Sequence, residues 1–252
     1  MKIVLFILVL SVLSVATGCG GGGSDGGGDG SGGYVGTYAV EVLSIKFNHS
    51  GAPCSDAGGV ITVNKSGVIS GTMVDRFNPS WELAGVVLSN GEIIDGHANL
   101  YGHPAADFFG DIINGGTYED RTGCTGIWSV TKGDFLPLTT ESPYKSQYEA
   151  TLTIINKDDI VVPFPACRDT SGLLLVSNQG KVSANLFAPD STDFNVRLSG
   201  VVLSTGDIIA GDIWVPAESE YSQGNYFGNI NDVLIVETKH GCIGELMLTP
   251  RS

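Results

Sequence analysis

The sequence predicts an all-β protein made of two tandem small antiparallel β-barrels, or β-sandwiches, that arose by internal duplication. Two observations lead to this fold class. After Tyr34, short apolar runs alternate with turn residues, and no amphipathic helical pattern of convincing length occurs. In addition, a twelve-residue stretch is present twice, as GVVLSNGEIIDG in Gly85–Gly96 and as GVVLSTGDIIAG in Gly200–Gly211.

Each copy of this stretch has the pattern of a β-hairpin, with two apolar runs around a polar turn that ends in glycine. A two-residue type I′ turn would require a positive φ at Thr205, which its β-branched side chain resists. We therefore expect a three-residue loop in both copies. Gly91 and Gly206 are expected to take the left-handed position that closes it.

The repeat extends beyond the hairpin and divides the chain into two β domains, residues 34–132 and 146–252, with a linker at residues 133–145. About seven strands are expected per copy, and sequential hairpins predict a meander that closes into a barrel to hide its edges. A two-sheet sandwich and one sheet system shared by both copies are the alternatives. The strands expected in the first copy cover residues 35–47, 60–64, 68–75, 81–88, 92–100, 107–114 and 125–131.

The N-terminal 18 residues have the features of an export signal. Lys2 is followed by an apolar run that is shorter than the about 20 residues needed to span a bilayer, and small residues then lead to Cys19. The segment Val15-Ala16-Thr17-Gly18-Cys19 resembles the lipobox of bacterial lipoproteins, with Ala16 where leucine is commonest. The resemblance implies that residues 1–18 are a signal peptide and that Cys19 is acylated, palmitate included. It also implies an exported protein with a lipid anchor in the cell envelope, at the outer membrane.

Residues 20–33 read GGGGSDGGGDGSGG, a composition that cannot bury apolar surface. Together with Cys19 they form the expected lipidated tether, residues 19–33. A flexible chain of this length has a root-mean-square span of about 20 Å, which is enough to hold a domain clear of lipid headgroups.

The four remaining cysteines fall as one pair in each copy. In an exported, oxidising setting they are expected to form disulfides. Three connectivities exist, and only Cys54 with Cys124 and Cys167 with Cys242 gives two equivalent domains. A site that binds metal through cysteines alone is the alternative, but no CxxC or CxxH spacing supports it.

The acidic charge balance and the absence of catalytic motifs reduce the number of functions that fit the sequence. The chain carries 27 acidic and 13 basic residues, a balance that disfavours nucleic acid and anionic lipid surfaces as partners of the folded part. No nucleophile elbow, HExxH motif, Walker loop or SxxK motif is present. No cofactor is expected, and the motifs do not predict an enzyme.

One group of residues in the first copy could hold zinc or calcium. The candidate ligands are His97, His103, Asp107 and Asp111, of which His97 has no histidine at the matching position of the second copy. Strand alternation would place Asp95 and His97 on one face. The competing interpretation is that these are solvated polar residues on a rim or loop.

Three functions remain at this level. The leading one is a membrane-anchored lipoprotein that acts as a non-catalytic binding or envelope-structural module, with an extracellular or periplasmic protein or glycan as partner. The second is a carrier of a small apolar ligand of lipocalin-like type, and the third is a hydrolase with a dispersed carboxylate site. The divergent loops at residues 101–106 and 215–224 are where we expect a binding surface.

The lipid anchor can be tested directly. Substituting Cys19→Ser removes the thiol that would be acylated, so the protein should leave the membrane fraction and be recovered in a soluble fraction. Fractionation followed by immunoblotting measures this. Cys54→Ser should leave membrane partition unaltered, and a Cys19→Ser protein that stays with the membrane would refute acylation as the anchor.

Overall fold

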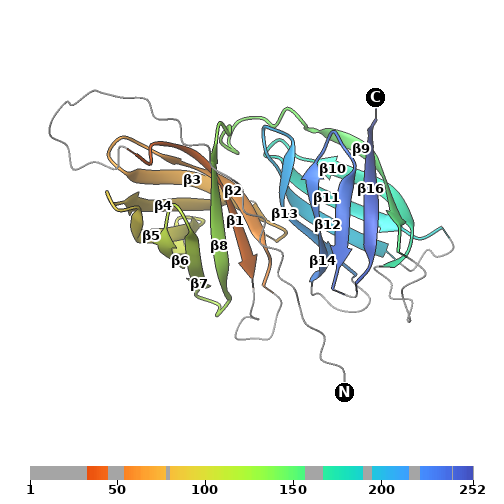
Figure 1. The fold of residues 1–252 in the computed structure, drawn as a ribbon, viewed down its shortest axis with the longest axis horizontal. Helices are drawn as coiled ribbons and strands as arrows, with labels where there is room; N and C mark the ends of the chain where they lie inside the picture. The colour runs from red at the N-terminus through yellow and green to blue at the C-terminus, as the bar shows by residue number, and fades with distance from the viewer. Residues whose placement is uncertain are drawn as a thin grey trace, which may run out of the picture.

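The computed structural model describes residues 33–44, 54–77, 80–156, 167–189, 195–215, 222–239 and 241–251. These residues form sixteen strands in two closed eight-stranded antiparallel barrels that lie side by side (Figure 1). The prediction of two tandem barrels is confirmed, and the alternatives of a sandwich or one shared sheet are not what the chain forms. Among the described residues no helix is long and apolar enough to cross a membrane.

The first barrel is formed by β1 (Gly36–Ser44), β2 (Ala57–Val63), β3 (Val68–Asp75), β4 (Trp81–Val87), β5 (Glu92–Leu100), β6 (His103–Asp111), β7 (Gly115–Asp120) and β8 (Thr125–Gly133). The second barrel is formed by β9 (Ser146–Ile154), β10 (Thr170–Val176), β11 (Lys181–Phe187), β12 (Asn195–Val202), β13 (Asp207–Trp214), β14 (Ser222–Asn229), β15 (Leu234–Thr238) and β16 (Ile243–Pro250). Each strand pairs with the next along the chain, and closure comes from β1 with β8 and β9 with β16.

The expected seven strands per copy were one too few. The missing strand, β7, begins with Gly115-Gly116, which is a turn signal in sequence reasoning. In the structure a Cβ on Gly116 would lie 1.9 Å from the carbonyl oxygen of Phe109 in β6. These glycines therefore allow two strands to approach closely.

The predicted hairpin loop is confirmed in both copies. The Gly91 N–H donates to the Leu88 carbonyl at 2.9 Å, and the Gly206 N–H donates to the Leu203 carbonyl at the same distance. The φ angles of the two glycines are 89° and 91°. Thr205 keeps a negative φ, as its β-branched side chain requires.

The end of the twelve-residue repeat forms a β-bulge. Asp95 and Ala210, at matching positions, have φ angles of 50° and 49°. The strand register shifts beside both, between Ala84 and Val86 in the first barrel. A Cβ on Gly211 would lie 2.0 Å from the carbonyl oxygen of Tyr226, so the glycine after the bulge is required by the neighbouring strand. The repeat therefore encodes a turn and a bend.

Each barrel has its own apolar core, and a third apolar cluster joins the two barrels. The side chains of Ala39, Val60 and Val74 point outward from β1–β3 and pack against Val201 and Leu203 of the second barrel. Leu138 of the linker completes this cluster. The parts of β1–β3 around these residues are thus buried on both faces, which explains the continuous buried run in β2.

Polar contacts also cross between the barrels. Glu41 accepts a hydrogen bond at 2.8 Å from the backbone N–H of Ala210, at the bulge of the second barrel. Arg76 forms a salt bridge of 3.3 Å with Asp212, and the side chains of both residues are at most 5% exposed. Because removal of one partner from such a pair leaves a buried charge, this contact fixes how the barrels meet.

The bulge can be tested by adding a single methyl group. Gly211→Ala should lower the free energy of unfolding by about 3 kcal/mol, because the methyl group clashes with backbone of β14. The control is Gly102→Ala, where φ is +77° and nothing lies within 4 Å, so that only backbone strain of about 1 kcal/mol is added. Urea unfolding measures both. Equal losses for the two variants would contradict the close approach at Gly211.

Candidate functional site: the mouth of the first barrel

Both predicted disulfides are present, at the same end of each barrel. Cys54 pairs with Cys124 at a Cα–Cα distance of 5.7 Å, and Cys167 pairs with Cys242 at 5.6 Å. Each bond joins the segment before the second strand to the segment before the last strand. Because these strands flank the first one, the disulfide fixes the place where the barrel closes.

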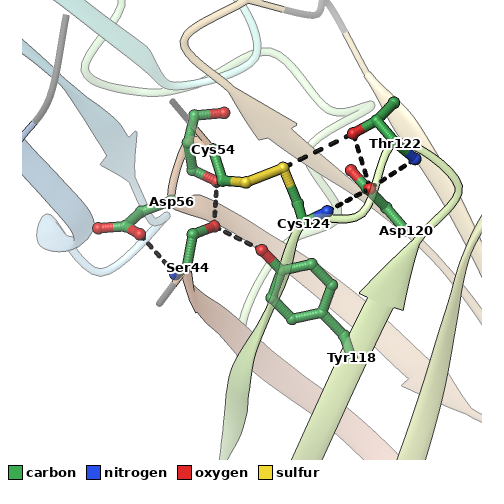
Figure 2. Close-up of a disulfide and its surroundings, with 8 residues drawn as sticks. Ser44, Cys54, Asp56, Tyr118, Asp120, Thr122 and Cys124 are labelled. Atoms are coloured by element: carbon green, nitrogen blue, oxygen red, sulfur yellow. Dashed lines mark hydrogen bonds between the residues drawn. A yellow bond between two sulfur atoms is a disulfide. The ribbon is translucent and has the colours of Figure 1, made fainter. Parts of the chain in front are cut away.

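Around the first disulfide, hydrogen bonds connect the ends of neighbouring strands (Figure 2). One carboxylate oxygen of Asp120 accepts hydrogen bonds from the Thr122 N–H at 2.8 Å and the Cys124 N–H at 2.9 Å. The Ser44 hydroxyl donates to the Ser55 carbonyl at 2.8 Å and is hydrogen-bonded to the phenol of Tyr118. Burial raises the pKa of Tyr118 to about 12, so its phenol stays protonated.

A pocket of about 320 Å³ opens at this end of the first barrel. We call it the mouth. It is lined by Val42, Cys54, Ser55, Ala57, Met73, Asp75, Phe77, Trp81, Leu100, Ala106, Tyr118, Asp120, Thr122 and Cys124. Its volume lies at the lower end of the range for small-molecule sites.

The mouth combines aromatic walls with hydrogen-bond acceptors. Asp75, which is 8% exposed, accepts hydrogen bonds from the Phe77 N–H at 2.8 Å and from the indole N–H of Trp81 at 3.1 Å. Phe77 is 59% exposed beside it. None of the described lining residues is a lysine, arginine or histidine. The mouth therefore suits a ligand with an apolar body and hydrogen-bond donors, either neutral or cationic.

Among the described residues, the matching positions of the second barrel carry buried aliphatic side chains. The pair Met73 and Trp81 on β3 and β4 corresponds in register to Leu186 and Val196 on β11 and β12, both of which are fully buried. Likewise, Tyr118 corresponds to Val236. The first barrel thus has the aromatic residues Trp81 and Tyr118 at positions where the second barrel has the smaller aliphatic residues Val196 and Val236.

The two barrels also differ at an acidic position of the mouth and at a pair of positions on β5 and β6. Asp120 corresponds to Thr238 in the strand register. The pair Ala98 and Ala106 on β5 and β6 corresponds to Ile213 and Gly224 on β13 and β14. Ala98 and Ile213 are both fully buried, so the second barrel has the larger side chain at this core position.

Asp56, at the edge of the mouth, has a perturbed pKa. Its carboxylate accepts a hydrogen bond of 2.8 Å from the Ser44 N–H (Figure 2). Burial, together with the nearby carboxylates of Asp212 and Glu41, raises its pKa from 3.8 to about 6, while the hydrogen bond and Lys239 act in the opposite direction. Asp56 thus links the mouth to the contact between the barrels.

The predicted metal ligands are only partly brought together. His97 and Asp107 are cross-strand partners on β5 and β6, whereas His103 and Asp111 lie at opposite ends of β6. Asp111 accepts hydrogen bonds from Asn114 and the Ile113 N–H, which lower its pKa and use it as a turn residue. Within the described residues no group of three or more His, Cys, Asp or Glu could hold a metal ion.

Two further sequence predictions concern the strand face of Asp95 and His97 and the acylation of Cys19. The bulge interrupts strand alternation between Ile93 and Ala98, which both pack on the core, so alternation does not place Asp95 and His97 on one face. Cys19, the signal peptide and most of the tether lie outside the described residues. The acylation of Cys19 therefore stays a prediction.

The sequence pattern did not identify Asp75, Tyr118 or Trp81 as residues of a ligand site. Comparison of the two copies could have identified these residues, because each is matched by a different type of residue at the corresponding position of the second copy. The divergent segment at residues 101–106 does reach this end, where Ala106 lines the mouth. Comparison with protein-family models, with curated proteins and with solved structures found no match to the chain.

The raised pKa of Asp56 predicts how stability depends on pH. The folded protein binds more protons than the unfolded chain between pH 3.8 and about 6, so the free energy of unfolding should fall as pH rises through this window. Asp56→Asn should remove that fall and stabilise the protein at pH 7 by about 1 to 3 kcal/mol.

Urea unfolding at pH values from 4 to 7 measures this dependence. The exposed residue Asp232 offers a matched control, and Asp232→Asn should leave the pH profile as it is. A profile that is the same in the Asp56→Asn variant and in the parent protein would exclude Asp56 as its source.

Proposed function

We propose that the protein is an exported, lipid-anchored binding module of the cell envelope and that the mouth of the first barrel is its ligand site. The observation that carries the binding role is the difference between the two barrels. The copies share the residues that build the barrel, yet at the described positions around this end the first barrel has Trp81, Tyr118 and Asp120 where the second has Val196, Val236 and Thr238. The anchor rests on the lipobox-like segment that ends at Cys19.

Hydrogen bonds at the mouth favour binding over hydrolysis. Both carboxylate oxygens of Asp75 accept hydrogen bonds, one from the Phe77 N–H and one from Trp81. Asp120 is engaged with three donors in its own turn. A general acid or base must present its oxygen to the substrate, whereas both oxygens of Asp75 and one oxygen of Asp120 already organise the pocket wall.

The filled interior favours a ligand that stays at the mouth. Tyr118 stacks on Phe108 with ring centroids 6.0 Å apart, and Phe108 meets the edge of Trp128 at 6.1 Å. These rings, all less than 9% exposed, occupy the barrel behind the pocket. A carrier of lipocalin-like type would instead need an open interior.

The binding role can be tested with a neutral fluorescent probe, N-phenyl-1-naphthylamine, on the Cys19→Ser protein. We expect saturable fluorescence enhancement with one site per chain, because the aromatic walls offer a desolvated surface to the probe. The double variant Met73→Leu/Trp81→Val converts the mouth pair to that of the second barrel. It should weaken probe binding by about tenfold or more.

The second barrel supplies the control for that experiment. Leu186→Met is the reverse of the Met73→Leu exchange at the matching position of the second barrel, and it should leave probe affinity as in the parent. Probe binding that is equal in the parent and the double variant would place the site elsewhere. No saturable binding by the parent would contradict a small-molecule role for the mouth.

A further inference from the structure

A second hollow, separate from the mouth, lies where the outer face of the second barrel meets the first barrel. It has a volume of about 630 Å³, and we call it the inter-barrel groove. Its floor is the outer face of β10–β13, and Arg76, which follows β3, lines it from the first barrel. Both copies are therefore needed to form it.

Across the floor of the groove, the side chains change from apolar on β10 to cationic and aromatic on β12 and β13. One row across the sheet runs from Leu173 on β10 through Asn185 and Arg197 to Trp214 on β13. The neighbouring row begins with Leu175, which is 41% exposed. Apolar side chains thus lie at one side of the groove and guanidinium groups at the other.

The groove gathers positive charge in an acidic protein. Arg76, Lys181 and Arg197 line it, and none of its described lining residues is an aspartate or glutamate. The whole chain has only 13 lysines and arginines against 27 acidic residues. Arg76 is neutralised by Asp212 and Asp75 acts on Lys181, so Arg197 contributes the positive charge that no described acidic side chain pairs, and this charge attracts anions.

Trp214 holds two of these cations in place. The guanidinium carbons of Arg197 and Arg76 lie 4.8 Å and 5.0 Å from the centre of its ring. Arg76 is also paired with Asp212. Arg197, in contrast, makes no salt bridge with any described residue, and its Nε is buried without a hydrogen-bond partner. A stacked, desolvated guanidinium of this kind is ready to accept an oxyanion.

The first barrel lacks these features at the matching row. Glu82 and Asn99 take the places of Arg197 and Trp214 in the strand register. Val60, at the place of Leu173, is covered by the contact between the barrels. Neither the cations nor the exposed apolar strip is thus required to build a barrel of this type.

We propose that the inter-barrel groove binds an organic oxyanion, in which a carboxylate or phosphate group is attached to an apolar body. The oxyanion contacts Arg197 and Lys181. The apolar body lies over Leu173, Leu175 and Phe187. This site is independent of the ligand proposed for the mouth.

The test is calorimetric titration of the Cys19→Ser protein with sodium octanoate and with octyl phosphate, which separate the two head groups. At least one of them should bind with one site per chain, and its affinity should fall as salt is raised. The affinity for inorganic phosphate should be lower by about tenfold or more, because phosphate lacks the apolar body. Binding of neither octyl probe at millimolar concentration would overturn the proposal.

Variants identify the residues involved. Arg197→Gln should weaken the octyl probes by about tenfold or more, whereas Lys65→Gln, an equal change of charge at an exposed turn, should not. Leu175→Ser should weaken the octyl probes and leave inorganic phosphate unaffected, and this variant keeps every charge in place. Thermal unfolding of each variant verifies that it is folded. Unchanged octyl-probe affinity in both groove variants would refute the assignment.

Discussion

Pairing between the first and last strand of each copy is the constraint on which the rest of the structure depends. Strands β1 and β8 close one meander, and β9 and β16 close the other, so neither sheet is left with an open edge. Closure separates an inner face, which forms a core, from an outer face. The disulfides lie beside these closing pairs. Because apolar side chains fill both cores, the barrel ends and outer faces are left for binding.

Local chemistry made much of this fold predictable from the sequence, while features that depend on neighbouring strands were missed. Turn residues around Gly91 and the spacing of the cysteines each act within a short distance or through one covalent bond. The role of Gly116 depends on the backbone of β6, and burial of Val60 on both sides depends on the other barrel. Nothing in the local pattern of either residue carries that information.

The candidate site was harder to predict for the same reason. Asp75 and Trp81 occupy ordinary strand ends in the sequence, and the mouth exists because closure brings them together with Tyr118 from β7. The metal candidates illustrate the reverse case. His97 and His103 are close in sequence, yet only His97 and Asp107 are cross-strand partners, whereas His103 and Asp111 lie at opposite ends of β6. Comparison of the two copies is the more informative guide, because positions that differ are released from building the barrel.

The direction of β1 has a consequence for how the protein would stand on a membrane. The strand begins at Gly36, next to the tether and the Gly91 turn, and ends at Ser44 beside the mouth. Nine residues of extended chain cover about 30 Å, so the attachment point and the mouth lie at opposite ends of the barrel. A chain held by Cys19 would thus be attached at the end of the barrel opposite its opening, and the flexible tether would leave the opening free to face the surrounding medium.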